Sequence, residues 1–171
     1  VVAPHLCGMG GALLALVWAD DSVHALNAPG RAGSGASAAA LRAEGHASMP
    51  FRHDVRAVTV PGCIDGWIAL HERFGTLSLA DVFAPAIRLA GAGFPASPLL
   101  TSSVAQLDDA ARRNLSAFAD QATTPGATVQ LPRLARTLEV IAAGGRAAFY
   151  EGEFGAGLRE LGAGWFSADD L

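Results

Sequence analysis

A continuous apolar run dominates the first part of the chain. Residues 12–18 read ALLALVW, which is the length of a strand, and a second apolar segment follows at 23–26. The polar pair Asp20 and Asp21 lies between the two segments and has the composition of a tight turn. This pattern predicts an antiparallel hairpin that is buried on at least one face. The run is far shorter than the ~20 residues of a membrane span, so we expect no membrane-spanning segment.

Helical spacing of apolar positions dominates the rest of the chain. The predicted helices cover residues 38–44, 64–74, 79–89, 98–118, 132–144 and 153–161. Pro85 predicts a kink or a break in the third of these helices, and one further strand is expected at 57–60. Ser167 and Asp170 have the spacing of a capping box and predict the start of another helix. The pattern therefore predicts an α+β chain that is mostly helical.

Composition and charge exclude several classes of function. The chain of 171 residues is 51% hydrophobic and 16% charged, which is enough apolar side chain for a packed core. Its formal net charge of −4, without any run of basic residues, argues against binding to nucleic acid. The first residues lack the charged, apolar and small-residue order of a targeting segment, so we expect none in this chain. The compartment stays open, either cytoplasmic or extracytoplasmic.

Residues that could hold a metal or form a disulfide are few and scattered. Cys7 and Cys63 have no zinc-site spacing and make no disulfide framework, so both are interpreted as small buried residues. His46 and His53, with Asp54 next to the second, form a weak candidate metal cluster that lacks another acid on a predictable face. We therefore expect no metal and no cofactor.

Other polar residues also give no catalytic group. Glu151 and Glu153 could serve as a general acid–base pair, but a solvent-exposed helix start is the favoured interpretation. His71 shares the apolar face of its predicted helix, which favours a core or boundary position over a ligand role. No residue of this chain is therefore predicted to be catalytic.

Three stretches carry a resemblance to a known family. They are PHLCGMGGALLALVWAD at 4–20, ALNAPGRAG at 25–33 and VTVPGCIDGWIALHERFGTLSLADVFAPAIRLAGAGFPASP at 58–98. Shorter matches follow at 134–138, 144–145, 149–152 and 169–171. Together they resemble the γ-glutamyltranspeptidase family over nearly the whole chain. The third stretch is the most specific, because its Pro, Gly, Trp and charged residues occur in the family's order.

The resemblance implies a four-layer αββα sandwich of the N-terminal-nucleophile hydrolase type. Residues 1–171 would be part of its large-subunit domain, a mostly helical fragment with a few core strands. The family's precursor cleaves itself, and the N-terminal threonine of the small subunit is then both nucleophile and base. That threonine begins a Thr-Thr-His type of segment, which this sequence lacks. A small subunit from the same precursor is the implied partner, in a heterodimer or higher oligomer. Either this partner or self-association of the chain would cover the aggregation-prone apolar run at 12–18.

Arg31 is the one residue to which the resemblance gives a specific role. The matching arginine in the family grips the α-carboxylate of the γ-glutamyl group. A planar guanidinium suits this task because it donates two parallel hydrogen bonds to a carboxylate, and Gly30 lets the backbone come close. Gly33 stands where the family usually has proline, which predicts a looser loop. Arg31 is therefore the predicted substrate-binding residue.

The resemblance implies an enzyme that hydrolyses or transfers γ-glutamyl groups of small glutathione-like compounds. The nucleophile would belong to the second subunit and not to this chain. Two alternatives stay open. One is a related β-lactam acylase, since the same scaffold serves other amides. The other is a non-catalytic family member, or a scaffold fragment that acts through a partner chain.

Overall fold

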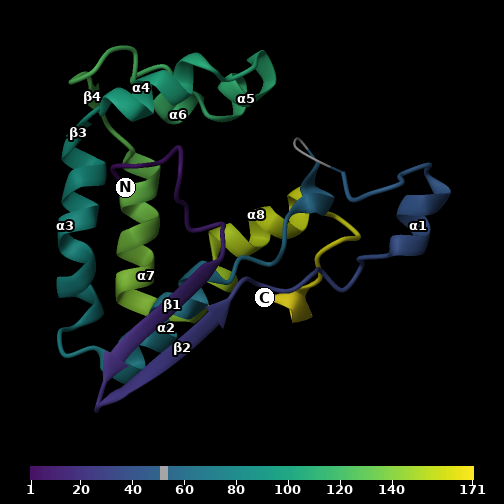
Figure 1. Ribbon diagram of the computed structural model, residues 1–171, viewed down its shortest axis with the longest axis horizontal. Coiled ribbons are helices and arrows are strands. Elements are labelled where there is room, and N and C mark those ends of the chain that lie inside the picture. The colour runs from purple at the N-terminus through teal and green to yellow at the C-terminus, as the bar shows by residue number, and fades with distance from the viewer. Residues whose placement is uncertain (51–53) are drawn as a thin grey trace. The chain divides into compact units, whose positions relative to one another are not determined.

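The structure is a computed structural model that describes residues 1–50 and 54–171. The chain forms two compact units, each assembled from separate stretches of sequence. The first unit contains Val1–Gly8 and Thr76–Gly145, and the second contains Met9–Gly75 and Arg146–Leu171. Figure 1 shows the elements of both. The candidate site lies entirely within the second unit.

The predicted hairpin is confirmed and forms the sheet of the second unit. Strand β1 (Leu13–Ala19) pairs antiparallel with β2 (Ser22–Ala28), in a register that sets Leu13 opposite Ala28. Asp20 and Asp21 form the turn, both with positive φ (50° and 55°), which is the backbone of the tight hairpin turns that match the twist of the strands. Aspartate tolerates this conformation better than most residues do.

The two faces of the hairpin have different environments. One face rests on helix α2 (Cys63–Phe74), which lies beside the strands in Figure 1. A Cβ added at Gly66 of α2 would lie 2.7 Å from a methyl carbon of Leu13, so the helix and the strand are in close contact. The other face carries apolar side chains that are mostly exposed: Leu14, Leu16, Trp18 and Val23. The face on α2 is only partly buried among the described residues, so the predicted burial of one face is borne out in part.

The other described elements that lie wholly within the second unit are short. They are α1 (Ala38–Ala43), a 3-10 helix η1 (Val55–Ala57), α8 (Glu153–Leu161) and a second 3-10 helix η2 (Ala168–Asp170). The helices predicted at 38–44, 64–74 and 153–161 are confirmed. Ser167 is the N-cap of η2, as the capping-box spacing predicts.

The strand predicted at 57–60 is wrong. Residue 57 ends η1, and residues 58–60 join no ladder among the described strands. Val60 donates its N–H to the carbonyl of Arg31 at 2.8 Å. The contact does not continue as a ladder because Pro29 has no N–H to donate and Gly30 has a positive φ of 79°. The apolar composition of residues 57–60 was therefore not sufficient to predict a strand.

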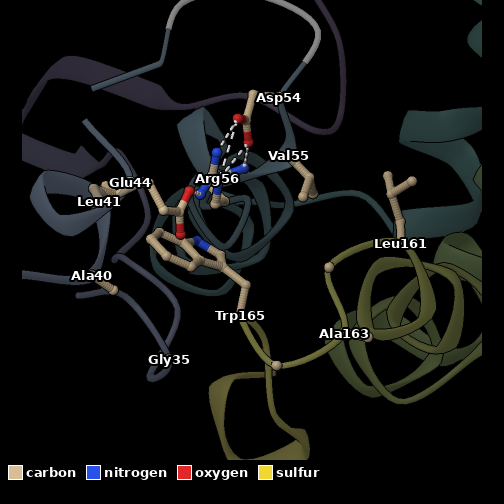
Figure 2. Close-up of a pocket in the computed structure, with 12 residues that line it drawn as sticks. Gly35, Ala40, Leu41, Glu44, Asp54, Val55, Arg56, Leu161, Ala163 and Trp165 are labelled. Atoms are coloured by element: carbon tan, nitrogen blue, oxygen red, sulfur yellow. Dashed lines mark hydrogen bonds and ion pairs between the residues drawn. The ribbon is translucent and has the colours of Figure 1, made fainter. Parts of the chain in front are cut away.

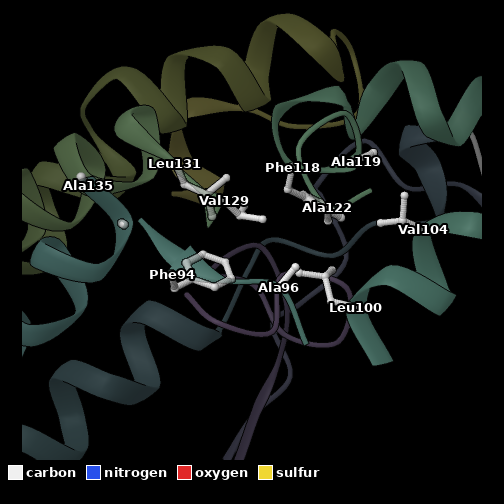
Figure 3. Close-up of a cluster of buried hydrophobic side chains, with 11 residues drawn as sticks. Phe94, Ala96, Leu100, Val104, Phe118, Ala119, Ala122, Val129, Leu131 and Ala135 are labelled. Carbon is white, nitrogen blue, oxygen red and sulfur yellow. The ribbon is translucent and has the colours of Figure 1, made fainter. Parts of the chain in front are cut away.

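The first unit is helical, with a small two-stranded sheet. Its elements are α3 (Leu79–Ala92), β3 (Phe94–Pro95), α4 (Pro98–Ala105), α5 (Asp109–Asn114), α6 (Ser116–Ala119), β4 (Thr128–Val129) and the start of α7 (Pro132–Tyr150). Strands β3 and β4 pair antiparallel. Buried residues from these elements, among them Phe94, Leu100 and Val129, form one apolar core (Figure 3).

Three helices of the first unit differ from the predictions. Helix α3 runs through Pro85 without a break, while the kink that Pro85 also predicts stays a prediction. One helix was expected over 98–118, but α4, α5 and α6 occupy this stretch, because Asp108 caps a new helix by accepting a hydrogen bond from the N–H of Ala111 at 2.7 Å. Helix α7 was expected to end at Gly144 and Gly145, and its helical geometry does break at Gly145 (φ 61°, ψ −143°) before resuming.

The chain as described is about half helical with four strands, which agrees with the predicted combination of helices and a few strands. Among the described helices, none combines the length and the apolar composition of a membrane span. The described strands form two two-stranded sheets, and the four-layer sandwich stays a prediction.

Candidate functional site

A backbone junction after strand β2 places Arg31. A Cβ on Gly30 would overlap the carbonyl oxygen of Val60, and a Cβ on Gly62 would lie 2.6 Å from the nitrogen of Gly30. The hydrogen bond from Val60 N–H to Arg31 O closes this junction at 2.8 Å. Two glycines therefore let the 28–31 and 59–62 segments touch through their backbones, and this contact fixes the position of the Arg31 main chain.

The Arg31 side chain extends from this junction and is 63% exposed. Its Nη2 donates to the carbonyl oxygen of Asp169 at 2.7 Å and lies 3.8 Å from the Oδ1 of Asp170. Among the described residues, no acceptor lies within hydrogen-bonding distance of its Nε or Nη1. One side of the guanidinium is thus anchored to the protein, and the other N–H groups are available to a ligand.

Asp170 connects the loop that carries Arg31 to the second sequence segment of this unit, Arg146–Leu171. Its carboxylate is only 4% exposed. It accepts hydrogen bonds from the N–H and the hydroxyl of Ser34, at 3.0 and 2.8 Å, and from the N–H and the hydroxyl of Ser167, at 2.8 and 3.0 Å. These donors, the backbone N–H groups of Ser167 and Ser34 first, hold the pKa of Asp170 well below its usual range.

The expected looseness of the loop at Gly33 is wrong. A Cβ on Gly33 would approach the carbonyl oxygen of Trp165 and would lie 2.8 Å from a ring carbon of Phe166. Gly35 donates its N–H to the same Trp165 carbonyl at 3.2 Å. The absence of a proline ring lets the backbone lie against the 164–166 segment, so the glycine makes the loop close-packed.

Acid pH should weaken the hydrogen bonds that the Asp170 carboxylate accepts from Ser34 and Ser167. Because the pKa of Asp170 is lower in the folded protein than its ordinary value near 3.8, the carboxylate stabilises the fold above that value and loses this effect as the pH falls below it. We expect Asp170→Asn to lower the thermal midpoint of the complete protein at pH 7. The variant should also show a shallower fall of the midpoint between about pH 5 and pH 3.

Asp169→Asn is the matched control, because the side chain of Asp169 is exposed. Its thermal midpoint should follow the wild type across the same pH range. Equal acid sensitivity of Asp170→Asn and the wild type would refute the role of the Asp170 carboxylate.

Arg31 lines a cavity of about 560 Å³. Its wall also contains Arg146, Asp65 and Tyr150. The Tyr150 hydroxyl donates to the carbonyl of Pro61 and accepts from the N–H of Asp65 at 3.3 Å, and burial raises the pKa of Tyr150. Tyr150 therefore supports the cavity wall as a neutral hydrogen-bonding group.

Arg146 enters the cavity wall beside Tyr150. Its Nε donates to Asp65 Oδ1 at 2.8 Å, its Nη2 donates to the backbone oxygen of Leu171 at 3.0 Å, and its guanidinium lies 4.7 Å from the centre of the Tyr150 ring. Sequence reasoning missed Arg146 and Asp65 as cavity residues and treated Asp170 only as a helix cap. Nothing local marks these positions, because 81 residues separate Arg146 from Asp65.

A second cavity, of about 320 Å³, is lined by Arg56, whose guanidinium nitrogens all donate hydrogen bonds within the protein. Figure 2 shows Arg56 bound by Asp54 and Glu44. Its Nε and Nη2 donate to Asp54 at 3.0 and 2.8 Å, and its Nη1 donates to Glu44 at 2.6 Å. The hydrogen bonds from Arg56 lower the pKa of Asp54 to about 2. All three nitrogens of Arg56 are engaged, so we assign it a structural role.

The weak metal candidate gains no support. His46 lies 3.4 Å from Arg56 Nη2 and 3.8 Å from Glu44, while His53 lies outside the described residues. In the part of the chain that the structure describes, no group of three histidine, cysteine or acidic residues could hold a metal ion. Cys63 is buried as expected, whereas Cys7 is exposed.

A family model and individual known proteins were compared with this chain, and their matches agree on one family. A family model described as Gamma-glutamyltranspeptidase matches residues 1–171. The glutathione hydrolase-like YwrD proenzyme of Bacillus subtilis is 36% identical over 166 residues, which are 90% of this chain and 30% of that protein. An acylase ACY 1 proenzyme of a Pseudomonas species is 38% identical over 110 residues, 61% of this chain and 20% of that protein.

A solved structure is also similar. The cephalosporin acylase of Bacillus halodurans has a TM-score of 0.88 and 30% identity, covering 99% of this chain and 34% of the acylase chain. This chain therefore spans about a third of the length of the YwrD proenzyme and of the cephalosporin acylase chain.

Proposed function

Since the chain belongs to the γ-glutamyltranspeptidase family, we propose that it supplies the substrate-binding wall of an enzyme that hydrolyses or transfers γ-glutamyl groups. The observation that carries this proposal is Arg31, which is anchored through Nη2 at a cavity and keeps Nε and Nη1 available. The ligand group is the α-carboxylate of a γ-glutamyl compound. The nucleophile is the N-terminal threonine of a second chain from the same precursor.

The proposed reaction has two steps. The threonine oxygen forms a bond to the γ-carbonyl carbon, its proton moves to the α-amino group of the same threonine, and the carbon–nitrogen bond breaks as the leaving amine takes a proton. Water or an amino acid then attacks the ester and releases the γ-glutamyl group. Arg31 acts throughout by holding the α-carboxylate, so the carbonyl stays in position for attack.

The second chain also has a structural task in this proposal. The exposed side chains of Leu14, Leu16 and Trp18 form an apolar face on β1, beside unpaired strand edges. We propose that the second chain covers this face within the αββα sandwich. Two observations support it: the relatives are about three times as long, and the name of the Bacillus subtilis relative calls it a proenzyme.

Intact mass of the complete purified protein under denaturing conditions tests the processing step. We expect two chains, the smaller one beginning with threonine. Arg31→Ala should be processed as the wild type is, because Arg31 is proposed to bind substrate and not to cleave the chain. A single uncut species without turnover would contradict the proposal and favour a non-catalytic family member.

A β-lactam acylase is the second candidate, favoured by the match to the cephalosporin acylase structure. The two activities differ in their amide substrates, so parallel assays of a γ-glutamyl anilide and an acylated cephalosporin separate them. Turnover of the γ-glutamyl compound alone supports the first candidate, and turnover of the cephalosporin alone supports the second.

A further inference from the structure

Arg146 lines the cavity of about 560 Å³ but has no role in the proposed function. It follows Gly145, where the helical geometry of α7 breaks, and lies in the stretch in which the helix resumes. Its Nε donates to Asp65 at 2.8 Å, its Nη2 donates to the backbone oxygen of Leu171 at 3.0 Å, and its guanidinium lies 4.7 Å from the centre of the Tyr150 ring. Three groups therefore fix the orientation of this guanidinium.

Two of these groups belong to a well-packed part of the cavity wall. Asp65 lies in the first turn of α2, and its N–H donates to the hydroxyl of Tyr150 at 3.3 Å. Tyr150 is only 2% exposed, and its hydroxyl donates to the carbonyl of Pro61, within the backbone junction that places Arg31. Arg146 is thus bound to the wall that carries this junction.

The third group belongs to the short segment that anchors the side chain of Arg31. Nη2 of Arg31 donates to the backbone oxygen of Asp169 at 2.7 Å, two positions before Leu171. Asp169 lies in η2, and the N–H of Leu171 donates to the carbonyl of Ala168 at 3.2 Å, which continues the same turn. Because one helical turn includes both residues, a displacement of Leu171 also moves the Asp169 carbonyl.

Arg146 and Asp170 hold the η2 segment at two points. The Asp170 carboxylate joins it to the loop that carries Arg31, and Arg146 joins its C-terminal end to Asp65 on α2. A segment that is held at one point can turn about that point, and a second contact restricts this motion. Loss of Arg146 would therefore let η2 turn about Asp170, and the Asp169 carbonyl would turn with it.

The exposure of this contact favours an effect on geometry over an effect on stability. The side chains of Arg146 and Asp65 are 47% and 56% exposed, and ion pairs of such exposure contribute little to the stability of a fold. The planar guanidinium nevertheless sets a direction, because its Nε and Nη2 bind two groups at once. A shift of about 1 Å in a group that positions the substrate is enough to lower the rate.

We propose that Arg146 is a positioning residue for Arg31. The backbone junction fixes the main chain of Arg31, and Arg146 fixes the Asp169 carbonyl that orients its guanidinium. The inference rests on the proposed function, in which this guanidinium binds the α-carboxylate of the substrate. Arg146 acts through Arg31 and not on the substrate itself.

A double-mutant cycle on the complete protein tests this coupling. The substrate is a γ-glutamyl anilide, whose leaving group has no charge that Arg146 could bind. We expect Arg146→Gln to lower kcat/KM about fivefold, through KM, which is within the range of coupled neighbours. In the Arg31→Ala background the same change should have no further effect, because the residue through which Arg146 acts is gone. An equal loss in both backgrounds would overturn the inference.

Two further variants separate geometry from charge. Arg146→Lys keeps the charge but cannot bind Asp65 and Leu171 with a fixed fork, so it should restore only part of the loss. Full restoration would indicate an effect of charge alone and would overturn the inference. Arg159→Gln on α8 is the matched control, because Arg159 is exposed and lies outside the cavity wall, and it should keep the wild-type kcat/KM.

Amide hydrogen exchange of the complete protein without substrate gives a readout that does not depend on turnover. In Arg146→Gln the N–H of Leu171 should exchange faster, because η2 is held at one point only. The N–H of Val60, which donates to the carbonyl of Arg31 in the backbone junction, should keep its rate. Faster exchange at both positions would indicate a general loosening, and unchanged exchange at both would indicate no effect on η2. Either result contradicts the inference.

The two readouts also separate this inference from the proposed function. If the wild type does not cleave the anilide but exchange responds to Arg146→Gln as expected, the proposed function fails and the effect of Arg146 on η2 remains. If the wild type cleaves it and Arg31→Ala lowers kcat/KM, while Arg146→Gln changes neither kcat/KM nor exchange, the inference fails and the proposed function stands.

Discussion

Arg31→Ala is expected to lower kcat/KM of the complete protein for γ-glutamyl substrates by about a hundredfold or more. A hydrogen bond to a charged group contributes roughly 1.5–3 kcal/mol. Nη2 has a second hydrogen besides the one donated to Asp169, and together with Nε or Nη1 it can make two such bonds to one carboxylate. Each 1.4 kcal/mol corresponds to a factor of about ten. Most of the loss should appear in KM, because the carboxylate is bound in the ground state and in the transition state alike.

Three measurements make this prediction specific. Arg31→Lys keeps the charge without the fork and should fall between the wild type and Arg31→Ala. Arg42→Ala removes an exposed arginine of α1 and should leave kcat/KM unchanged. The thermal midpoint of Arg31→Ala should stay close to that of the wild type, since the side chain is largely exposed. An unaltered kcat/KM would show that Arg31 does not hold the substrate.

Gly30→Ala is expected to have the largest effect on stability. The alanine Cβ would overlap the carbonyl oxygen of Val60, and the φ of 79° is unfavourable for any residue with a Cβ. The conformation alone costs about 1–2 kcal/mol, and the steric overlap forces the 59–62 segment to move. We expect a strong loss of soluble, correctly processed protein and a large drop of the thermal midpoint in what remains.

Two other glycines separate the causes of this loss. Gly45 has a φ of 92°, but among the described residues nothing lies near its added Cβ, so Gly45→Ala isolates the cost of the backbone conformation. Gly10 has neither problem, so Gly10→Ala should behave as the wild type does. The expected order of thermal midpoints is Gly10→Ala, then Gly45→Ala, then Gly30→Ala. Equal midpoints for the last two would show that the close approach to Val60 is not required.

Local signals in the sequence were sufficient for the local parts of this fold. The hairpin could be predicted because the apolar runs and the Asp20–Asp21 turn are adjacent in the chain. The same holds for α2 and α8, each of which has its own apolar stripe and its own end signals. The helix predicted over 98–118 failed, because the capping side chain of Asp108 outweighs an apolar spacing that would continue across it.

The candidate site could be predicted only in part. Arg31 was identified because its loop resembles that of a known family. Its partners could not be found in this way, because 138 positions separate it from Asp169 and 136 separate Ser34 from Asp170. No periodicity or spacing rule spans such a distance. The second arginine was missed for the same reason, since only the folded second unit places Arg146 on the cavity that Arg31 lines.

The divided sequence of the second unit has a consequence for the order of events during synthesis. Ser34 leaves the ribosome 136 residues before Asp170 does, and at about 5–20 residues per second this takes on the order of 7–27 seconds. Throughout this interval the loop that carries Arg31 lacks its hydrogen-bond partners from residues 165–170. Residues 76–145, which contain the whole apolar core of the first unit, are complete earlier. The candidate site is therefore the last part of this chain to be completed, and a nascent chain that stops at residue 145 lacks the part of the cavity wall that residues 146–171 supply.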